Sequence, residues 1–341
     1  MSEFLQKLSG FLKNSDDPNI SMAKLNANTN DIVQLSASIP AVKNSRVVEN
    51  RDSIELISVG EPEYGKINCF LDGMQRTRTA FYSKGVPIVY AYTAAVIRKR
   101  AETRKMENYA RPISKEALYI PYKIYDKDII ENAGIATIDT SDDLKEFVNH
   151  PAMLEQYAAE KINNTREDLE STLANRWIEE NINNDDWIII DGSLPKIESK
   201  IDPSNINAIG MIKSHNTLYF PMEEMSKVFA MQVGQRSSVF IPDSPKKAPV
   251  HSWYLRLYPN DGKDPFFGLI RVEVPMCDRT FDIVNSICKW ILNEKNPLSL
   301  PDMRYDKMLY PIRDCEQYLK SLAPSYILLD AIQLSLKSAF L

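Results

Sequence analysis

The feature that most constrains this chain is a short, wholly apolar run that stops at a carboxylate. The segment WIIIDGSLP (187–195) places three isoleucines before Asp191, Gly192 and Ser193. An apolar run of this length, bounded by turn residues, is typical of a buried strand. In open α/β sheets, ligands bind beyond the carboxyl ends of the strands. The run therefore predicts a buried strand that presents the Asp191 carboxylate at its functional end.

A second apolar run carries the same Asp-Gly pair. In INCFLDG (67–73), Asp72 and Gly73 follow an apolar run as Asp191 and Gly192 follow theirs. Asp-Gly is common in turns, so each pair taken alone also fits a simple turn. Two carboxylates on adjacent strand ends, however, can converge on a hard divalent cation, which takes oxygen ligands. We therefore predict a metal site shared by Asp72 and Asp191.

A third carboxylate is expected from the helical segment that precedes this strand. Glu170 shares a helical face with Leu173 and Trp177, at i, i+3 and i+7, whereas a solvated glutamate would lie opposite Trp177. Glu170 is therefore a candidate ligand, although an exposed glutamate at the edge of the apolar stripe fits the spacing equally well. Glu167 and Glu179 are its rivals on the same helix.

Composition and motif content exclude several classes of protein. The 341 residues include four cysteines with no CxxC pair and three histidines, too few for a disulfide framework, a zinc site or a His-rich metal centre. Neither GxGxxG nor GxxxxGK[ST] occurs, which argues against a dinucleotide or nucleoside-triphosphate fold. The scattered cysteines indicate a reducing compartment, so we expect a cytoplasmic protein. No run approaches the roughly 18 apolar residues of a membrane span.

The hydrophobic pattern predicts an α/β chain with a short N-terminal extension before the main domain. We expect residues 1–50 to form a helical extension and lead-in, and 51–341 to form one domain. The expected strands are 53–60, 67–73, 87–97, 117–125, 187–191, 208–214, 237–243, 252–259 and 268–275, the last two forming a hairpin with a long turn. The expected helices lie near the N-terminus and in 141–184, 279–295 and 328–340.

The N-terminal helix has an apolar stripe that needs a partner. The stripe consists of Phe4, Leu5, Leu8, Phe11 and Leu12. A lone helix could not leave it in water. Three partners are open for the stripe: the chain's own core, a second copy in a homodimer, or a partner protein.

Two basic segments are candidates for phosphate contact. Arg76 and Arg78 lie just beyond Asp72 in the sequence. The run RKRAETRK (98–105) concentrates basic residues that either track a DNA backbone or form a solvated connector.

The order of these motifs resembles that of the NurA nuclease family. Between residues 66 and 340 the chain shows, in order, FLDGM, a helix with an internal glutamate, IIIDGSLP, GMIKSH, RVEVP and LYPIRDCEQYL. The resemblance implies a ribonuclease-H-like mixed sheet flanked by helices over residues 51–341. It implies a DNA nuclease that uses Mn²⁺ or Mg²⁺ and acts, as a homodimer, with a HerA-type hexameric ATPase in DNA repair or anti-phage defence.

The resemblance also assigns roles to individual residues. Asp72 and Asp191 match the family's two metal-binding aspartates, and Glu170 matches its helical glutamate. Lys213 in GMIKS matches a basic residue, which would neutralise a phosphate oxygen, and Tyr310 in LYP matches a C-terminal tyrosine. These five residues are the implied catalytic set, and the three carboxylates are the implied metal ligands.

The chain departs from the family at one position. Many members place a histidine eight residues after that tyrosine, where this chain has Tyr318. Asp302, Asp306 or Glu316 would then supply the missing ligand or base. If none does, the alternative is a catalytically weak or inactive subunit that docks on a ring ATPase and regulates it.

Overall fold

The computed structural model describes residues 2–14, 20–21, 41–49, 53–142, 146–182, 184–197, 200–243, 249–295, 307–328 and 330. The helices are α1 (Glu3–Asn14), α2 (Asp128–Glu131), α3 (Pro151–Glu180), α4 (Met222–Phe229), α5 (Thr280–Glu294), α6 (Tyr310–Leu322) and the 3-10 turn η2 (Pro203–Asn205). The strands are β1 (Ile20–Ser21), β2 (Ala41–Val42), β3 (Ser45–Val47), β4 (Leu56–Ser58), β5 (Ile67–Ser83), β6 (Val86–Arg100), β7 (Met106–Asn108), β8 (Ile113–Ile120), β9 (Thr137–Asp139), β10 (Trp187–Asp191), β11 (Ala208–Ile212), β12 (Thr217–Leu218), β13 (Gln235–Ser237), β14 (Phe240–Pro242), β15 (Val250–Arg256) and β16 (Leu269–Pro275).

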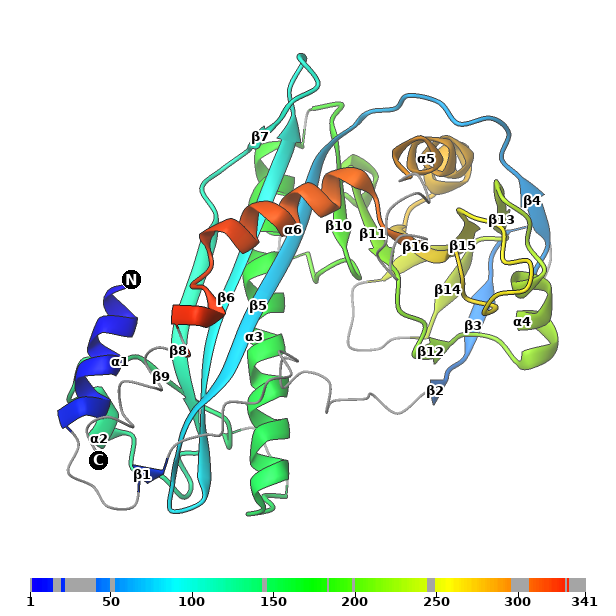
Figure 1. The fold of residues 1–341 in the computed structure, drawn as a ribbon. Coiled ribbons are helices and arrows are strands. Elements are labelled where there is room, and N and C mark those ends of the chain that lie inside the picture. Colours follow the sequence, from blue (N-terminus) through cyan, green and yellow to red (C-terminus); the bar gives the residue numbers. More distant parts are fainter. Residues whose placement is uncertain are drawn as a thin grey trace.

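Most strands join one large mixed sheet. Its main path runs β3-β14-β15-β16-β11-β10-β5-β6-β8-β9. β5 and β6 form a long antiparallel hairpin, and β8 adds to β6 antiparallel. β10 lies parallel to β5, and β11 lies parallel to β10 (Figure 1). The chain therefore has the mixed α/β sheet flanked by helices that the sequence predicts, and the predicted 252–259/268–275 hairpin is confirmed as β15 and β16.

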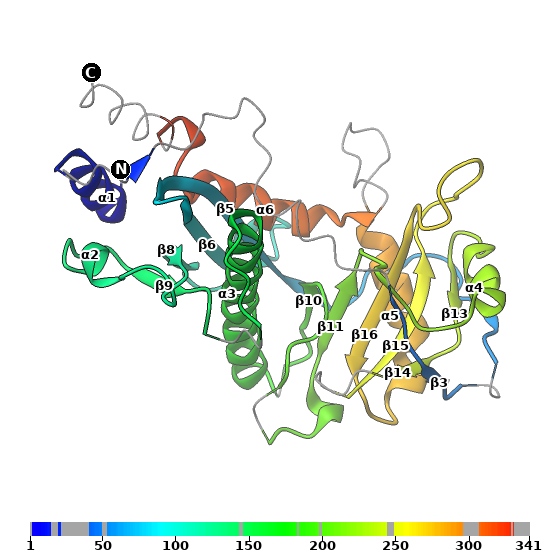
Figure 2. The ribbon, with the colours of Figure 1, turned by 90° about the horizontal axis from the view of Figure 1, so that it is seen from below.

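Helices cover both faces of the central strands. Figure 2 shows α3 on one side of β5 and β6 and α6 on the other. On the α3 side, Leu173 and Trp177 pack in one core cluster with Leu71 and Ile190. The residues that alternate with these on β5 and β10 face a second cluster, formed with α5 and α6. A strand buried on both faces reads as a continuous apolar run, which is why WIIID is so distinct in the sequence.

The apolar stripe of α1 packs on the chain's own core. Leu5, Leu8 and Leu12 are each at most 3% exposed, and they belong to a cluster that includes Phe81 of β5 and Leu118 of β8. The stripe therefore has its partner within the same chain. The expectation that it docks on a second copy or on a ring ATPase is wrong for these three leucines.

The strand that carries Asp72 is longer than its apolar pattern predicts. β5 continues through Gly73 to Ser83 and pairs with β6 over this extension. The Asp72–Gly73 pair therefore lies inside a strand, so both the strand-end expectation and the simple turn are wrong here. The extension MQRTRTAFY is rich in threonine and aromatic residues, which favour half-buried strands. Its polar side chains interrupt the apolar run without ending the strand.

Other predicted boundaries also changed. The 237–243 run is divided between β13 and β14, and the 141–184 helical segment is ordered as a helix only over α3. The expected helix 328–340 lies almost wholly outside the described residues. No helix in the described part of the chain is long and apolar enough to cross a membrane. The division at residue 50 stays a prediction.

Candidate functional site

Two aspartates lie on neighbouring parallel strands. β10 pairs with β5 so that Ile190 is opposite Leu71, and Asp191 and Asp72 each follow this pair. Side chains two residues apart on a strand point to the same face of the sheet. Phe70 and Ile189, two residues before Asp72 and Asp191, belong to the core on the side of α5 and α6, so both aspartates face that side. Asp191 is the last residue of β10, whereas Asp72 is buried inside β5. The two strands are thus neighbours, as predicted.

Glu170 approaches the aspartates from α3, which covers the other face of the sheet. It is 8% exposed, although most glutamates of this helix face solvent. Gly73 allows this approach, since a Cβ built there would lie 2.0 Å from Oε1 of Glu170. The rival Glu167 has a side chain that is 59% exposed, and Glu179 is exposed. Of the three candidates, only Glu170 reaches the aspartates as a buried group.

The cluster carries more negative charge than its surroundings favour. Burial raises the pKa of Asp72 well above its usual range, the charge of Asp191 raises it further, and Lys213 opposes both. Burial also raises the pKa of Glu170 to about 7, against the lowering effect of Arg166. The charge of Asp191 raises the pKa of Glu170 as well. A cation placed among these groups would relieve both burial and repulsion.

Two side-chain cations already lie on the carboxylates. The Nζ of Lys213, just after β11, lies 2.6 Å from Oδ2 of Asp191. The guanidinium of Arg166 forms an ion pair with Glu170, one helical turn further along α3. Lys213 thus lies beside one of the carboxylates, and its predicted contact with a phosphate oxygen stays a prediction. Arg166 was not predicted, and its i−4 spacing from Glu170 is the only signal in the sequence that could have indicated it.

A buried glutamate holds the turn that follows Asp191. Gly192 has a φ of 126°, which favours glycine, and the amide of Leu194 donates to Oε2 of Glu273 at 3.1 Å. Glu273 is 3% exposed and pairs with Arg271 at 2.5 Å. A Cβ at Gly210, opposite Glu273 in the β11–β16 ladder, would lie 2.8 Å from the Leu194 nitrogen. The DGSL motif is therefore a turn packed closely on β11 and fixed by β16.

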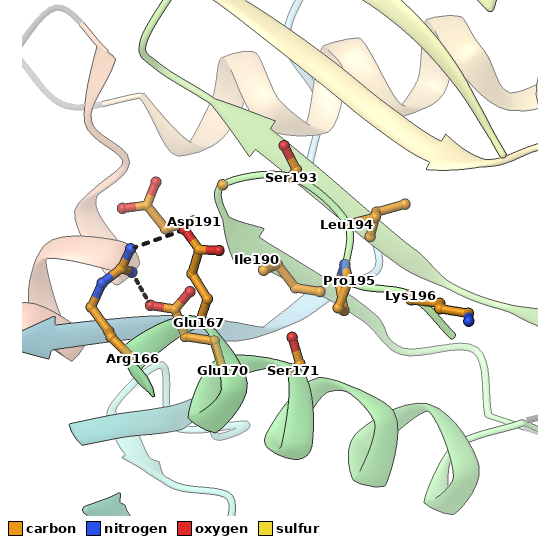
Figure 3. Close-up of a pocket in the computed structure, with 11 residues that line it drawn as sticks. Arg166, Glu167, Glu170, Ser171, Ile190, Asp191, Ser193, Leu194, Pro195 and Lys196 are labelled. Atoms are coloured by element: carbon orange, nitrogen blue, oxygen red, sulfur yellow. Dashed lines mark hydrogen bonds and ion pairs between the residues drawn. The ribbon is translucent and has the colours of Figure 1, made fainter. Parts of the chain in front are cut away.

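A cavity of about 400 Å³ opens beside Glu170 and Asp191 (Figure 3). One wall is α3, and the other is the turn after β10. Its lining combines acids with hydroxyl and basic groups: Arg166, Glu167, Glu170, Ser171, Asp191, Ser193 and Lys196. The cavity gives a solute direct access to two of the three clustered carboxylates.

Helix α6 adds one acidic group near Asp72, whereas its tyrosines Tyr310 and Tyr318 make other contacts or are exposed. Glu316 has a side chain that is 14% exposed, and its charge raises the pKa of Asp72. Tyr310, the first residue of α6, is 62% exposed. Tyr318 instead accepts a hydrogen bond from Asn108 at 2.6 Å and stacks on a guanidinium of β6. Asp302 and Asp306 lie outside the described residues.

The predicted basic segments are engaged in contacts within the chain. Arg76 and Arg78 both lie over the ring of Tyr326, and Arg78 pairs with Asp330 at 2.5 Å. The first three residues of the 98–105 run belong to β6, so the connector interpretation is wrong for them. These residues pair, in order, with Asp314, Asp186 and Glu294. Contact between either segment and phosphate stays a prediction.

The carboxylates are gathered but not arranged as ligands. Among the described residues, no group of three or more His, Cys, Asp or Glu side chains is spaced to hold a metal ion. Lys213 instead pairs with one oxygen of Asp191, and Arg166 pairs with one oxygen of Glu170. The donor set itself consists of carboxylate oxygens, which suit Mg²⁺ and Mn²⁺.

Comparison with known proteins gives one structural similarity. No family model matches the chain, and no protein of curated function matches it in sequence. Among solved structures, the crystal structure of the NurA nuclease from Sulfolobus solfataricus is similar, with 14% sequence identity and a TM-score of 0.44. The match covers 87% of this chain and 86% of that one. A similarity of this degree does not identify the chemistry of the site.

Proposed function

We propose that this protein is a metal-dependent DNA nuclease whose site is built on Asp72, Glu170 and Asp191. The observation that carries the proposal is the cluster itself, in which two buried carboxylates with raised pKa values lie beside a third. Burying like charges together costs stability, and such perturbed groups concentrate at functional sites. A site that recruits a divalent cation accounts for this arrangement.

The three carboxylates would hold the cation, and Glu316 is a further candidate on α6. A bound Mn²⁺ or Mg²⁺ supplies an activated water and stabilises charge on the phosphate. Lys213, now on Asp191, would neutralise a non-bridging phosphate oxygen. The exposed Tyr310 stays a candidate for contact with substrate. DNA as the substrate is supported by the resemblance in motif order to the NurA family.

A ring ATPase of the HerA type is the proposed partner. The sequence contains no GxxxxGK[ST] loop, yet processive degradation of duplex DNA needs strand separation or translocation. Another protein would supply that work, with this chain acting as a homodimer. Because the leucines of α1 are buried in their own chain, the docking surface belongs to other residues.

The second candidate function is a catalytically weak or inactive subunit that regulates the same kind of ATPase. It is favoured by Tyr318, which replaces the family's histidine and contacts Asn108 instead of the carboxylates. It is also favoured by the absence, among the described side chains, of a set arranged as metal ligands. The clustered carboxylates favour the nuclease, because a scaffold has no use for them.

The test is degradation of labelled linear DNA with Mn²⁺, with and without a cognate ring ATPase. We expect cleavage by the wild type, loss of cleavage with EDTA, and loss of cleavage by Asp191→Ala. Asp168→Ala, which changes an exposed aspartate of α3, is the matched control and should cut normally. Full activity of Asp191→Ala would overturn the site. A wild type that cuts nothing but stimulates ATP hydrolysis would establish the regulatory subunit instead.

A further inference from the structure

Arg166 lies between the carboxylate cluster and the cavity. Its guanidinium pairs with Glu170 and donates to Oδ1 of Asn163 at 2.9 Å. The nitrogen that donates to Asn163 also lies 3.8 Å from Oε1 of Glu167. The side chain is 22% exposed and lines the cavity wall (Figure 3). Lys213, the other cation of the cluster, does not line this cavity. Arg166 is therefore the cation that contacts both a carboxylate of the cluster and the solute space.

Helix stability does not explain the Arg166–Glu170 pair. An i,i+4 ion pair stabilises a helix more when the acid comes first, and here the arginine comes first. The side chain of Glu170 is only 11% exposed, so the cost of desolvation offsets much of the attraction. What the pair does accomplish is to neutralise Glu170 within a cluster of acids.

We propose that Arg166 is a phosphate-binding residue, held by Glu170 in the metal-free protein and released toward the cavity when Glu170 ligates a divalent cation. This inference rests on the proposed nuclease function. The carboxylate of Glu170 cannot bind the guanidinium and a divalent cation equally well at the same time, because the two positive charges repel each other. A guanidinium binds phosphate with two parallel hydrogen bonds, which suits it to a phosphodiester. The hydroxyls of Ser171 and Ser193 line the same cavity and add donors.

The proposal requires two effects of opposite sign when the arginine is removed. Without its positive charge, Glu170 is more available, so Mn²⁺ binds more tightly. Without its donors, a phosphate contact is lost, so DNA binds more weakly and with less dependence on salt. A merely structural role for Arg166 would weaken both kinds of binding together.

The experiment compares Arg166→Gln with a matched control, Arg176→Gln. Arg176 pairs with Glu180 on the same helix, with the same spacing and order, but both side chains are exposed. Mn²⁺ binding is measured by calorimetry at one pH for all variants. DNA binding is measured with a short phosphorothioate oligonucleotide, which resists cleavage, over a series of salt concentrations in the presence of Mn²⁺.

We expect Arg166→Gln to bind Mn²⁺ on the order of tenfold more tightly than the wild type. Its salt slope for the oligonucleotide should fall by about one. Arg166→Lys, which keeps the charge and the fold, should retain the slope and bind the oligonucleotide with intermediate affinity. Arg176→Gln should match the wild type in both measurements.

Two results separate failure of the inference from failure of the function. If the wild type binds Mn²⁺ but Arg166→Gln behaves as Arg176→Gln does, Arg166 is not a phosphate ligand and the nuclease proposal stands. If the wild type binds no Mn²⁺, the nuclease proposal fails and the inference fails with it. Weaker binding of both Mn²⁺ and the oligonucleotide by Arg166→Gln would also overturn the inference, since it indicates a structural role.

Discussion

Gly73 and Glu170 approach so closely that a methyl group on the glycine would lie 2.0 Å from Oε1 of the glutamate. The glycine is in β5 and the glutamate in α3, so the missing side chain is what lets α3 bring a carboxylate to the aspartates. The Asp-Gly pair at this position therefore serves close packing and not a turn.

Gly73→Ala should displace Glu170 without unfolding the chain. The atoms that the new methyl group meets belong to a flexible side chain, which can turn away. We expect DNA cleavage to fall on the order of 100-fold, as for other displacements of catalytic groups by about 1 Å. Thermal unfolding should change little. The double variant Gly73→Ala/Glu170→Gln should be no worse than Glu170→Gln alone, because both changes remove one interaction. Fully additive losses in this cycle would show that Gly73 acts by another route.

Substitution of the helical glutamates should distinguish the buried one from its neighbours. Glu170→Gln keeps the shape of the side chain but weakens it as a cation ligand. Loss of a residue that only supports a ligand costs about 10- to 100-fold, so we expect a rate loss of at least about 100-fold. Affinity for DNA should be constant. Glu167→Gln and Glu179→Gln, both exposed, are the controls. A larger defect in either control would place the ligand at that position instead.

Asp72→Asn should stabilise the metal-free protein at high pH. The pKa of Asp72 is raised in the folded state, so the unfolded chain loses this proton first, near pH 4. Between that pH and the folded-state pKa, the folded state binds more protons, and the free energy of unfolding falls as pH rises. The loss is complete above the folded-state pKa. Asparagine carries no such proton, so the variant should unfold at a higher temperature than the wild type at pH 8.

Thermal unfolding in EDTA at pH 5 and pH 8 measures this difference. Asp168→Asn, at an exposed position, should follow the wild-type profile. Mn²⁺ added at pH 8 should raise the unfolding temperature of the wild type more than that of Asp72→Asn, because ligand binding to the folded state stabilises it. Identical pH profiles for wild type and Asp72→Asn would show that folding does not raise the pKa of Asp72.

The parts of the site that the sequence predicts are those set by local periodicity. WIIID is recognisable because a strand buried on both faces is apolar throughout, and Glu170 is recognisable because it follows the buried stripe of α3. The sequence predicts β5 too short because five consecutive polar residues, QRTRT (75–79), interrupt its apolar run while still pairing with β6.

The rest of the site depends on the order of strands in the sheet, which periodicity does not contain. Glu273 reaches the amide of Leu194 across 79 positions of sequence, only because β16 lies beside β11. Gly210 faces the same turn because β11 lies beside β10. Neither residue has a local pattern that distinguishes it from an ordinary strand residue.

Leu8→Ala in α1 should destabilise the fold without affecting the site. Leu8 is 3% exposed and packs in the cluster that includes Phe81. Removing a buried leucine side chain costs about 2–5 kcal/mol in the free energy of unfolding. Lys13→Ala, on the exposed side of the same helix, should cost almost nothing. Urea denaturation measures both, and Mn²⁺ affinity should be unchanged in each folded variant. A stable Leu8→Ala protein that fails to dimerise would reinstate α1 as an interface.

Glu273→Gln should impair the site as well as the fold, and a half-buried glutamate paired with a buried arginine provides the comparison. Glu273 accepts from Arg271 and from the amide of Leu194, whereas Glu49 accepts from Arg236 and from the amide of Val239 at 2.8 Å. Each carboxylate thus joins a buried guanidinium to one backbone amide.

Replacing either glutamate leaves a buried arginine without its counter-charge, which typically costs about 3–5 kcal/mol. Glu273→Gln and Glu49→Gln should therefore lose similar amounts of stability in urea denaturation. Only Glu273 holds the turn that follows Asp191, so only Glu273→Gln should bind Mn²⁺ more weakly, by about 10- to 100-fold, and cut DNA more slowly at a temperature where both variants are folded. Equal Mn²⁺ affinity in the two variants would mean that the turn keeps its position without Glu273.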